Sequence, residues 1–550
     1  MKKIINLARN PFSWLALALL LAVGWKTWLV AGGWIPFNAD EAIVALMARH
    51  ILNDARPTFF YGQAYMGSLD ALLVALAFKI LGEQVWAIRL VQVLLYLGVI
   101  ASTAWLGKKS FNNWRVGALG ALLLAIPTVN VTLYTTASLG GYGEALLFGN
   151  IILLCALQID DQRRAGKFPG SLYWWALCGL FSGLGLWAFG LTLVYSLPAV
   201  VFLVLLSWRQ QKKEPVPRVR LATAFIALGL GALVGAAPWW LFALQHGFQA
   251  LLVELTGGAI AGVEGLPWIF QVFRHIANLL MFGSTVMFGL RPPWDVNWLA
   301  LPLLPFVLMF WMVVFVFIVR CLHRDSPARL AQALLAGIIL ALIAGFVLTP
   351  FGADPSGRYF LPMAIPLSLF AAAMIVELHA KIGHWALGLV VLLLVYYLWG
   401  TVQSALRFPP GVTTQFYGPA QVDHRYDQAL IDFLRQKAET RGYGNYWVAY
   451  PLAFLSAEDL IFVPRLPYHP DFRYTERDDR YMPYDDLVSQ AQRVAYITTN
   501  HPALDEYLRL NFKKLGVTSQ EIQIGDYHVF YALSQPVRPV EIGLGTTTSP

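Results

Sequence analysis

The chain has 550 residues, of which 57% are hydrophobic and only 13% are charged. Soluble domains carry about a quarter charged residues, so most of this chain is expected to lie in lipid. The net charge of +8 is placed unevenly between apolar segments, which indicates the cytoplasmic face of a membrane protein and argues against a nucleic-acid partner. The three cysteines lie in or beside apolar segments and are too few for a disulfide framework or a cysteine-based zinc site.

Eleven apolar segments are long enough to cross a bilayer, which takes about 20 residues. They lie at about residues 12–31, 84–106, 115–134, 143–159, 171–189, 190–208, 221–243, 299–320, 330–349, 359–378 and 384–402. We interpret the first as a retained helix, because the run is long and has no small-residue cleavage site. Lysine and arginine gather before it and in every second loop, near residues 108–115, 163–167, 209–220, 320–329 and 381. By the positive-inside rule this side is the cytoplasm, so the N-terminus is cytoplasmic and the chain after about residue 403 is external.

The chain therefore divides into two predicted parts: an α-helical polytopic membrane domain at residues 1–402 and a small external α/β domain at residues 403–550. In the second part charges are dense, and 423–442 and 502–516 show helical spacing. Four short runs are predicted strands: YWVAYP, LIFVP, VAYITT and YHVFYAL. Alternating helices and strands indicate an α/β fold. Its segment 468–486 is expected to be a solvated loop, with carbohydrate contact as the weaker alternative, and the C-terminal tail is expected to be flexible.

The first external loop, at residues 32–83, concentrates carboxylates beside long apolar runs. Asp40 and Glu41 precede a run with helical spacing, AIVALMARHIL, which predicts a short amphipathic helix lying on the membrane. Asp40 stands near the N-terminus of this helix, where the helix dipole favours an ionised carboxylate, as a general base requires. Asp70 opens an apolar segment too short to cross, at 68–82, which predicts a second surface or re-entrant helix. Carboxylates at a membrane face are costly unless paired, hydrated or used, so we expect a site here, with an ordinary hydrated loop as the alternative.

The same loop carries an acidic pair followed by a P-x-F-F-Y-G-Q-x-Y-x-G-S-L-D segment. The residues concerned are Asp40, Glu41, Pro57, Phe59, Phe60, Tyr61, Gly62, Gln63, Tyr65, Gly67, Ser68, Leu69 and Asp70. This pattern resembles the C superfamily of membrane glycosyltransferases (GT-C), which includes the protein O-mannosyltransferases, the lipid A aminoarabinose transferase and bacterial relatives similar to glycosyltransferase family 39. The resemblance is fairly specific in this loop and only topological elsewhere. It implies a transferase with Asp40 as the base and with Tyr61 and Gln63 among the substrate contacts. Asp70 is expected to orient the first loop or to contact the acceptor, and Glu41 to support the backbone or to bind sugar.

Two positions at later helix mouths are further candidates. Glu144 is the only charge of the second external loop; the sequence alone is equally consistent with function and hydration, whereas similar transferases carry an acidic residue there, around the donor phosphate or a metal. Arg358 is external, against the positive-inside rule, so a ligand or a lipid headgroup must hold it there. Similar transferases have an R-Y-x-x-P pattern at this place, here Arg358, Tyr359 and Pro362. We assign Arg358, with Tyr359 beside it, to the lipid phosphate, because a guanidinium suits bidentate phosphate contact.

The chain shows no glycine-rich nucleotide fingerprint, and no cytoplasmic loop has room for a nucleotide-sugar domain. A long external loop at residues 244–298 resembles the lids over the substrate grooves of the superfamily. The implied donor is a polyprenyl-phosphate-linked monosaccharide, and the acceptor is a hydroxyl group of a lipid, a glycan or a protein. The expected reaction is an inverting displacement on the external face of the cytoplasmic membrane. In it Asp40 takes the acceptor proton while Arg358 matches the charge of the leaving phosphate.

The sequence leaves a metal ion and one competing function open. A divalent ion shared by Asp40 and Glu144 would suit the reaction, but no cluster of His, Asp and Glu with ligand spacing is present in the sequence. The competing class is a transporter or flippase of lipid-linked sugars, with the carboxylates as coupling sites. Transporters tend to show two related halves and charges within the spans, whereas this chain places its acids in external loops, so we favour the transferase.

Overall fold

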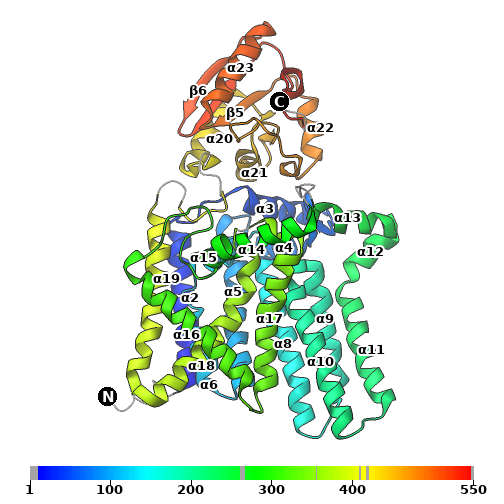
Figure 1. The fold of residues 1–550 in the computed structure, drawn as a ribbon. Helices are drawn as coiled ribbons and strands as arrows, with labels where there is room; N and C mark the ends of the chain where they lie inside the picture. The colour runs from blue at the N-terminus through cyan, green and yellow to red at the C-terminus, as the bar shows by residue number, and fades with distance from the viewer. Residues whose placement is uncertain (1–9, 261–266, 355, 408–410, 416–419, 547–550) are drawn as a thin grey trace.

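The computed structural model describes residues 10–546, apart from 261–266, 355, 408–410 and 416–419. A bundle of long helices carries a smaller α/β domain on one end (Figure 1). The bundle contains α2 (Pro11–Ala31), α5 (Val85–Phe111), α6 (Trp114–Leu123), α7 (Val129–Tyr134), α8 (Tyr142–Arg164), α9 (Leu172–Ala188), α10 (Leu193–Lys213), α11 (Arg218–Gly235), α16 (Leu304–His323), α17 (Arg329–Leu348), α18 (Ala364–Ile382) and α19 (Gly388–Leu406). Toward the external domain lie α3 (Ala39–Leu52), α4 (Leu69–Leu81), α12 (Ala237–His246), α13 (Phe248–Ile260), α14 (Trp268–Asn278), α15 (Ser284–Met287) and the hairpin of β1 (Phe59–Phe60) and β2 (Gln63–Gly67).

Eight helical segments of the described residues are long and apolar enough to cross a membrane. The last of them, Arg358–Leu406, contains both α18 and α19, joined at Gly383–Leu387. α9 is apolar but has only 17 residues, and the predicted crossing at 115–134 is broken into α6 and α7 with Pro127 between them. Proline lacks an N–H group and interrupts a helix, which explains the break. The helical membrane fold is confirmed, whereas the number of eleven crossings stays a prediction.

The basic loops predicted on the cytoplasmic side gather at the end of the bundle away from the external domain (Figure 1). Arg164, at the end of α8, donates to the backbone oxygen of Pro327 at 2.9 Å, which joins two of these loops. Arg320, at the end of α16, pairs with Glu377 of α18 at 3.0 Å. The charges are thus segregated as the sequence pattern indicates. Which side of the membrane this end faces stays a prediction.

The helix predicted after Asp40 is present as α3. Most of its residues are buried, because α3 packs against both α4 and α21 (Tyr446–Leu455) of the external domain. Its N-cap is Asn38, whose side-chain oxygen accepts from the Glu41 N–H at 3.3 Å. The predicted helix is therefore confirmed and is covered largely by protein, whereas its position at the membrane surface stays a prediction. The segment predicted at 68–82 is the separate short helix α4, as expected.

The external domain is built on a five-stranded sheet with the strand order β4–β3–β5–β7–β6. Its elements are α20 (Asp427–Lys437), β3 (Arg441–Tyr443), α21, β4 (Ile461–Val463), α22 (Pro483–Ser489), β5 (Ala495–Thr499), α23 (Pro502–Lys514), β6 (Gln520–Ile524) and β7 (Tyr527–Tyr531). β3 runs parallel to β4 and β5, and β7 runs antiparallel to β5 and β6. The predicted α/β character of this part is confirmed.

One of the predicted strands is wrong. The run YWVAYP, at residues 446–451, begins helix α21, which continues to Leu455. Asn445 caps this helix by accepting from the Trp447 N–H at 3.0 Å. The run is apolar and almost entirely buried, and periodicity alone cannot assign a short apolar run to a strand or a helix. The first residue of α21, Tyr446, lies beside Asp40.

Candidate active site

A cavity of about 600 Å³ lies between the bundle and the external domain. Its membrane-side wall includes Asp40, Gln63, Met66, Tyr134, Tyr142 and Arg358. Its other wall belongs to the external domain and includes Tyr446, Trp447, Tyr468, Arg473, Arg477, Asp478 and Arg480. The structure thus brings together three of the predicted site residues, Asp40, Gln63 and Arg358. The segment 468–486, expected to be a solvated loop, supplies much of the second wall.

Asp40 sits in the first turn of α3, at the positive end of the helix dipole. Its Oδ1 accepts a hydrogen bond of 2.7 Å from the hydroxyl of Tyr446. Within the described residues no hydrogen bond reaches its Oδ2. The carboxylate is therefore held by one oxygen and keeps the other for a ligand in the cavity.

Arg358 enters the cavity from a tight turn between α17 and α18. Gly357 has φ of +89°, and a Cβ atom there would lie 2.4 Å from Val286, so this turn requires glycine. Asn130 of α7 donates to the Gly357 carbonyl at 3.0 Å. The guanidinium pairs with Asp354 at 2.6 Å and lies over the Tyr359 ring, 5.0 Å from its centre. These contacts explain how a membrane-facing arginine is retained on this side of the bundle.

A second cavity of about 240 Å³ is almost wholly apolar and lies on the other side of this turn. Its lining includes Tyr65, Phe189, Leu191, Leu342, Phe346 and Tyr359. Arg358 lines the polar cavity, and the next residue, Tyr359, lines the apolar cavity, so neighbouring positions of the chain contribute to both. An arginine placed beside an apolar cavity suits an amphipathic ligand with an anionic head and an apolar tail.

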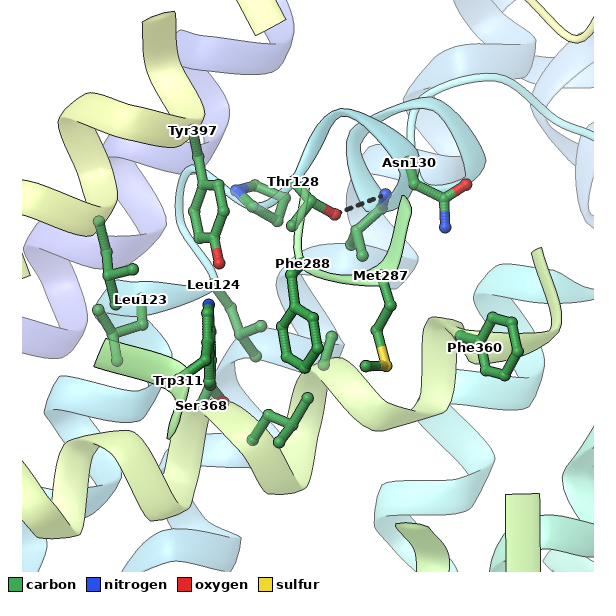
Figure 2. A pocket seen from close by; sticks show the side chains of 15 residues that line it. Leu123, Leu124, Thr128, Asn130, Met287, Phe288, Trp311, Phe360, Ser368 and Tyr397 are labelled. Atoms are coloured by element: carbon green, nitrogen blue, oxygen red, sulfur yellow. Dashed lines mark hydrogen bonds between the residues drawn. The ribbon is translucent and has the colours of Figure 1, made fainter. Parts of the chain in front are cut away.

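A third and smaller cavity of about 50 Å³ lies inside the bundle. Figure 2 shows Phe288, Trp311 and Tyr397 around it, with Asn130 at its edge. A water molecule takes about 30 Å³ in the liquid, so this space holds one or two waters and no substrate. The cavity is linked to the site through Asn130, whose side chain donates a hydrogen bond to the Gly357 carbonyl in the turn before Arg358.

Three buried N–H donors of the polar cavity have no hydrogen-bond partner within the described part of the chain: Arg358 Nε, Trp447 Nε1 and Arg480 Nε. Buried polar groups are nearly always hydrogen-bonded in proteins. Unpaired donors on both walls therefore indicate a ligand rich in acceptor oxygens, such as a phosphate or a sugar.

Two predicted substrate contacts lie outside the cavity. Glu41 is fully buried and forms a two-bond ion pair with Arg89, at 2.8 and 3.0 Å. Asp70 is buried and accepts from Ser138 at 2.7 Å and Gln92 at 2.8 Å. Burial raises the pKa of Asp70, although these two hydrogen bonds act in the opposite direction. Both carboxylates bind other side chains of the protein, so they stabilise the first loop and do not line the cavity.

Glu144 is also placed away from the cavity. It is fully buried at the start of α8, where the group that interacts with its carboxyl is Asp70. Asp40 and Glu144, the expected pair of metal ligands, do not line a common cavity. No group of three or more His, Cys, Asp or Glu residues in the described chain is arranged to hold a metal ion. The residues present do not fit the expected metal site, and we derive no step through a metal.

Tyr61, another predicted substrate contact, lies where α3 meets the external domain. Its hydroxyl is 3.1 Å from His50 Nδ1, and its ring stacks on Tyr481 at 4.8 Å. Glu458 of the external domain accepts from Tyr484 at 2.7 Å and faces His50 Nε2 at 3.0 Å. Partial burial alone would raise the pKa of Glu458, but the hydrogen bonds from His50 and Tyr484 outweigh it and lower the pKa to about 2. We call His50, Tyr61, Glu458 and Tyr484 the domain clamp.

Sequence reasoning missed Tyr446 and Trp447 in the wall contributed by the external domain, and it gave segment 468–486 a carbohydrate contact only as the weaker alternative. Tyr446 and Trp447 lie in the run interpreted as a strand, and Arg473, Arg477 and Arg480 lie in the segment interpreted as solvated. The only local signal was the density of arginine and aromatic residues in segment 468–486. No spacing in that segment could have paired it with the first loop.

The fold is similar to that of two solved membrane proteins. The aminoarabinose transferase ArnT from Cupriavidus metallidurans, bound to undecaprenyl phosphate, has a TM-score of 0.54 and 14% identity over 94% of this chain and 97% of that chain. The archaeal oligosaccharyltransferase AglB from Archaeoglobus fulgidus, in complex with an inhibitory peptide and a dolichol-phosphate, has a TM-score of 0.50 and 13% identity over 89% of this chain and 69% of that chain. No protein-family model and no curated protein matches the chain. The chain therefore has the fold of the GT-C membrane glycosyltransferases.

Proposed function

We propose that this protein transfers a monosaccharide from a polyprenyl-phosphate donor to an acceptor hydroxyl group on the external face of the cytoplasmic membrane. The observation that carries the proposal is that Arg358 lines the polar cavity of Asp40 while the next residue, Tyr359, lines an apolar cavity. A lipid phosphate placed there would rest on Arg358, with the part of its tail next to the phosphate in the apolar cavity. The solved structures of similar fold contain such lipids, undecaprenyl phosphate in ArnT and dolichol-phosphate in AglB.

The reaction follows from the two ends of the polar cavity. Asp40 Oδ2 accepts the proton of the acceptor hydroxyl as its oxygen bonds to the anomeric carbon from the face opposite the phosphate. The bond between that carbon and the phosphate oxygen breaks in the same step, which inverts the anomeric centre. The lipid phosphate leaves with the electron pair, and Arg358 matches its charge.

The unpaired donor Arg358 Nε supports this assignment, because the ion pair with Asp354 is made by Nη2 and leaves Nε without a partner among the described residues. A phosphate oxygen would supply the missing partner. Trp447 and Arg480 offer similar unpaired donors on the opposite wall, within reach of a sugar or an acceptor. The acceptor itself is a hydroxyl group of a lipid, a glycan or a protein.

The test uses the purified full-length protein in detergent with radiolabelled polyprenyl-phosphate sugars and crude envelope acceptors. We expect label to move to an acceptor in the wild type and not in Asp40→Asn. A parallel measurement in liposomes follows whether label crosses the bilayer. Label that crosses the bilayer but never reaches an acceptor would instead identify a flippase or transporter and overturn the transferase.

A further inference from the structure

The external domain reaches the candidate base directly. Helix α21 packs against α3, and its first residue, Tyr446, is only 4% exposed. Its hydroxyl donates to Asp40 Oδ1 at 2.7 Å across 406 positions of the chain. Burial, and next the charge of Asp40, raise the pKa of Tyr446 well above its ordinary value. The phenol therefore stays protonated and acts as the donor to Asp40.

Tyr446 is itself held in place from behind. The guanidinium of Arg480 lies over its ring, 5.5 Å from the ring centre. Arg480 also donates to the Gly62 carbonyl at 3.0 Å and, with the Gln63 amide oxygen turned toward it, to Gln63 at 2.8 and 2.9 Å. A Cβ atom at Gly62 would lie 2.5 Å from the Arg480 side chain, so this close approach requires glycine. Arg480 thus ties the Tyr446 wall to the first loop, beside Asp40.

The groups that face Asp40 come from both parts of the molecule. Tyr446 comes from α21, and Asp478, Arg480 and Tyr468 come from the segment that follows β4. Arg358 lines the same cavity from the bundle. Among these groups, the described contacts include a hydrogen bond to Asp40 only from Tyr446.

We propose that Tyr446 is a positioning residue for the Asp40 base, so that the external domain completes the active site. The inference rests on the proposed transferase function. By occupying Oδ1, the phenol fixes the carboxylate rotamer and leaves Oδ2 for the acceptor hydroxyl. A hydrogen bond donated to a carboxylate also favours its ionised form, which is the form that accepts a proton.

The test is Tyr446→Phe in the full-length protein in detergent, which removes one hydroxyl and keeps the ring under Arg480. Because hydrogen bonds to charged groups are worth about 1.5–3 kcal/mol, we expect kcat to fall by about 10-fold or more, with the donor KM unchanged. We also expect the acid limb of the pH–rate profile to move to higher pH, because the carboxylate then protonates more easily. The matched control is Tyr443→Phe, a buried tyrosine of the same domain with no hydrogen bond from its hydroxyl among the described residues.

The outcomes separate this inference from the function on which it rests. One outcome is that Asp40→Asn loses transfer while Tyr446→Phe keeps the wild-type rate and pH profile. This would overturn the role of Tyr446 and leave the transferase intact. No transfer by the wild type would overturn both. The position of the acid limb does not depend on how much of a preparation is folded, so it decides the question even if Tyr446→Phe is less stable.

Discussion

Two neighbouring carboxylates at the start of α3 have different roles because different groups face them. Asp40 is partly exposed to the polar cavity and holds one hydrogen bond from Tyr446. Glu41 is fully buried and neutralises Arg89 of α5. Successive helix residues point about 100° apart, so one carboxylate faces the cavity while the next faces the bundle. A single-residue shift along the helix therefore separates the proposed base from a carboxylate paired inside the bundle.

This division predicts different losses in two matched variants. Asp40→Asn is expected to fold and to lose at least about 100-fold in transfer, since a positioned general base contributes about 10²–10⁴-fold. Glu41→Gln is expected to lower the free energy of unfolding by about 3–5 kcal/mol, because it leaves Arg89 buried without its counter-charge. Transfer per folded molecule and thermal unfolding in detergent measure the two effects. Full transfer by Asp40→Asn would remove Asp40 as the base.

Arg358 provides a second test at the residue scale. Arg358→Lys keeps the positive charge but loses the planar fork that contacts both Asp354 and a phosphate. We expect turnover to fall by about 10-fold or more with thermal unfolding unchanged. Arg407→Lys, an arginine paired with Asp295 outside the cavity, is the control. If Arg358→Ala binds undecaprenyl phosphate and transfers sugar as the wild type does, Arg358 contacts lipid headgroups only.

At the scale of elements, the contact between α3 and α21 connects the two parts of the molecule. Phe454, near the end of α21, packs on Phe37 at 5.5 Å, and its carbonyl accepts from Arg49 of α3 at 3.1 Å. The domain clamp continues this contact through Glu458, just beyond α21. Because a helix is a stiff element, contacts at one end of α21 help to set the position of Tyr446 at the other end.

The clamp should depend on pH in a defined direction. A carboxylate whose pKa is lower in the folded state stabilises the fold above its unfolded pKa, and this contribution is lost as pH falls toward the folded value. For Glu458 that window runs from about 4.5 down to about 2. We expect Glu458→Gln to lower the melting temperature at neutral pH, with the difference from wild type shrinking as the pH falls through this window.

The neighbouring Asp459→Asn is the control for that series, because Asp459 is 63% exposed and pairs with Arg435 at the surface. Such surface pairs are worth little, so its melting temperature should follow the wild type at every pH. A difference between Glu458→Gln and wild type that stays constant down to low pH would contradict the charged role of Glu458.

At the scale of the whole molecule, the cavity exists only because two differently built parts meet. The bundle supplies Asp40, Arg358 and the apolar cavity, and the external domain supplies the opposite wall. Basic loops gather at the end of the bundle away from that domain (Figure 1). This charge segregation supports an external domain outside the cell.

Cysteine labelling of intact spheroplasts tests the orientation. In a background with Cys321→Ser, a membrane-impermeant thiol reagent should modify a cysteine placed at Ser534, which is exposed on the external domain, and spare one placed at Gln211. Labelling after lysis is the control for the reactivity of the second site. The reverse pattern in intact cells would invert the topology, and the site would then face the cytoplasm.

The class of the protein and part of its candidate site could be predicted from the order of the residues alone. Long apolar runs and the bias of lysine and arginine are local and additive signals, so the helical bundle, its basic end and the external α/β part could be predicted without coordinates. Asp40 and Arg358 could be singled out because a charge beside apolar segments is costly and needs a reason. The number of crossings could not be predicted as reliably, because the apolar run at 115–134 forms two short helices with Pro127 between them.

Only the tertiary structure decided which of the candidates share a cavity. Glu41, Asp70 and Glu144 are as acidic in sequence as Asp40, yet each is buried behind the first loop by its packing. Tyr446 reaches Asp40 across 406 positions, and no local pattern encodes a contact between elements so far apart. What a side chain does depends on the groups that surround it after folding, and here half of those groups belong to a different part of the chain.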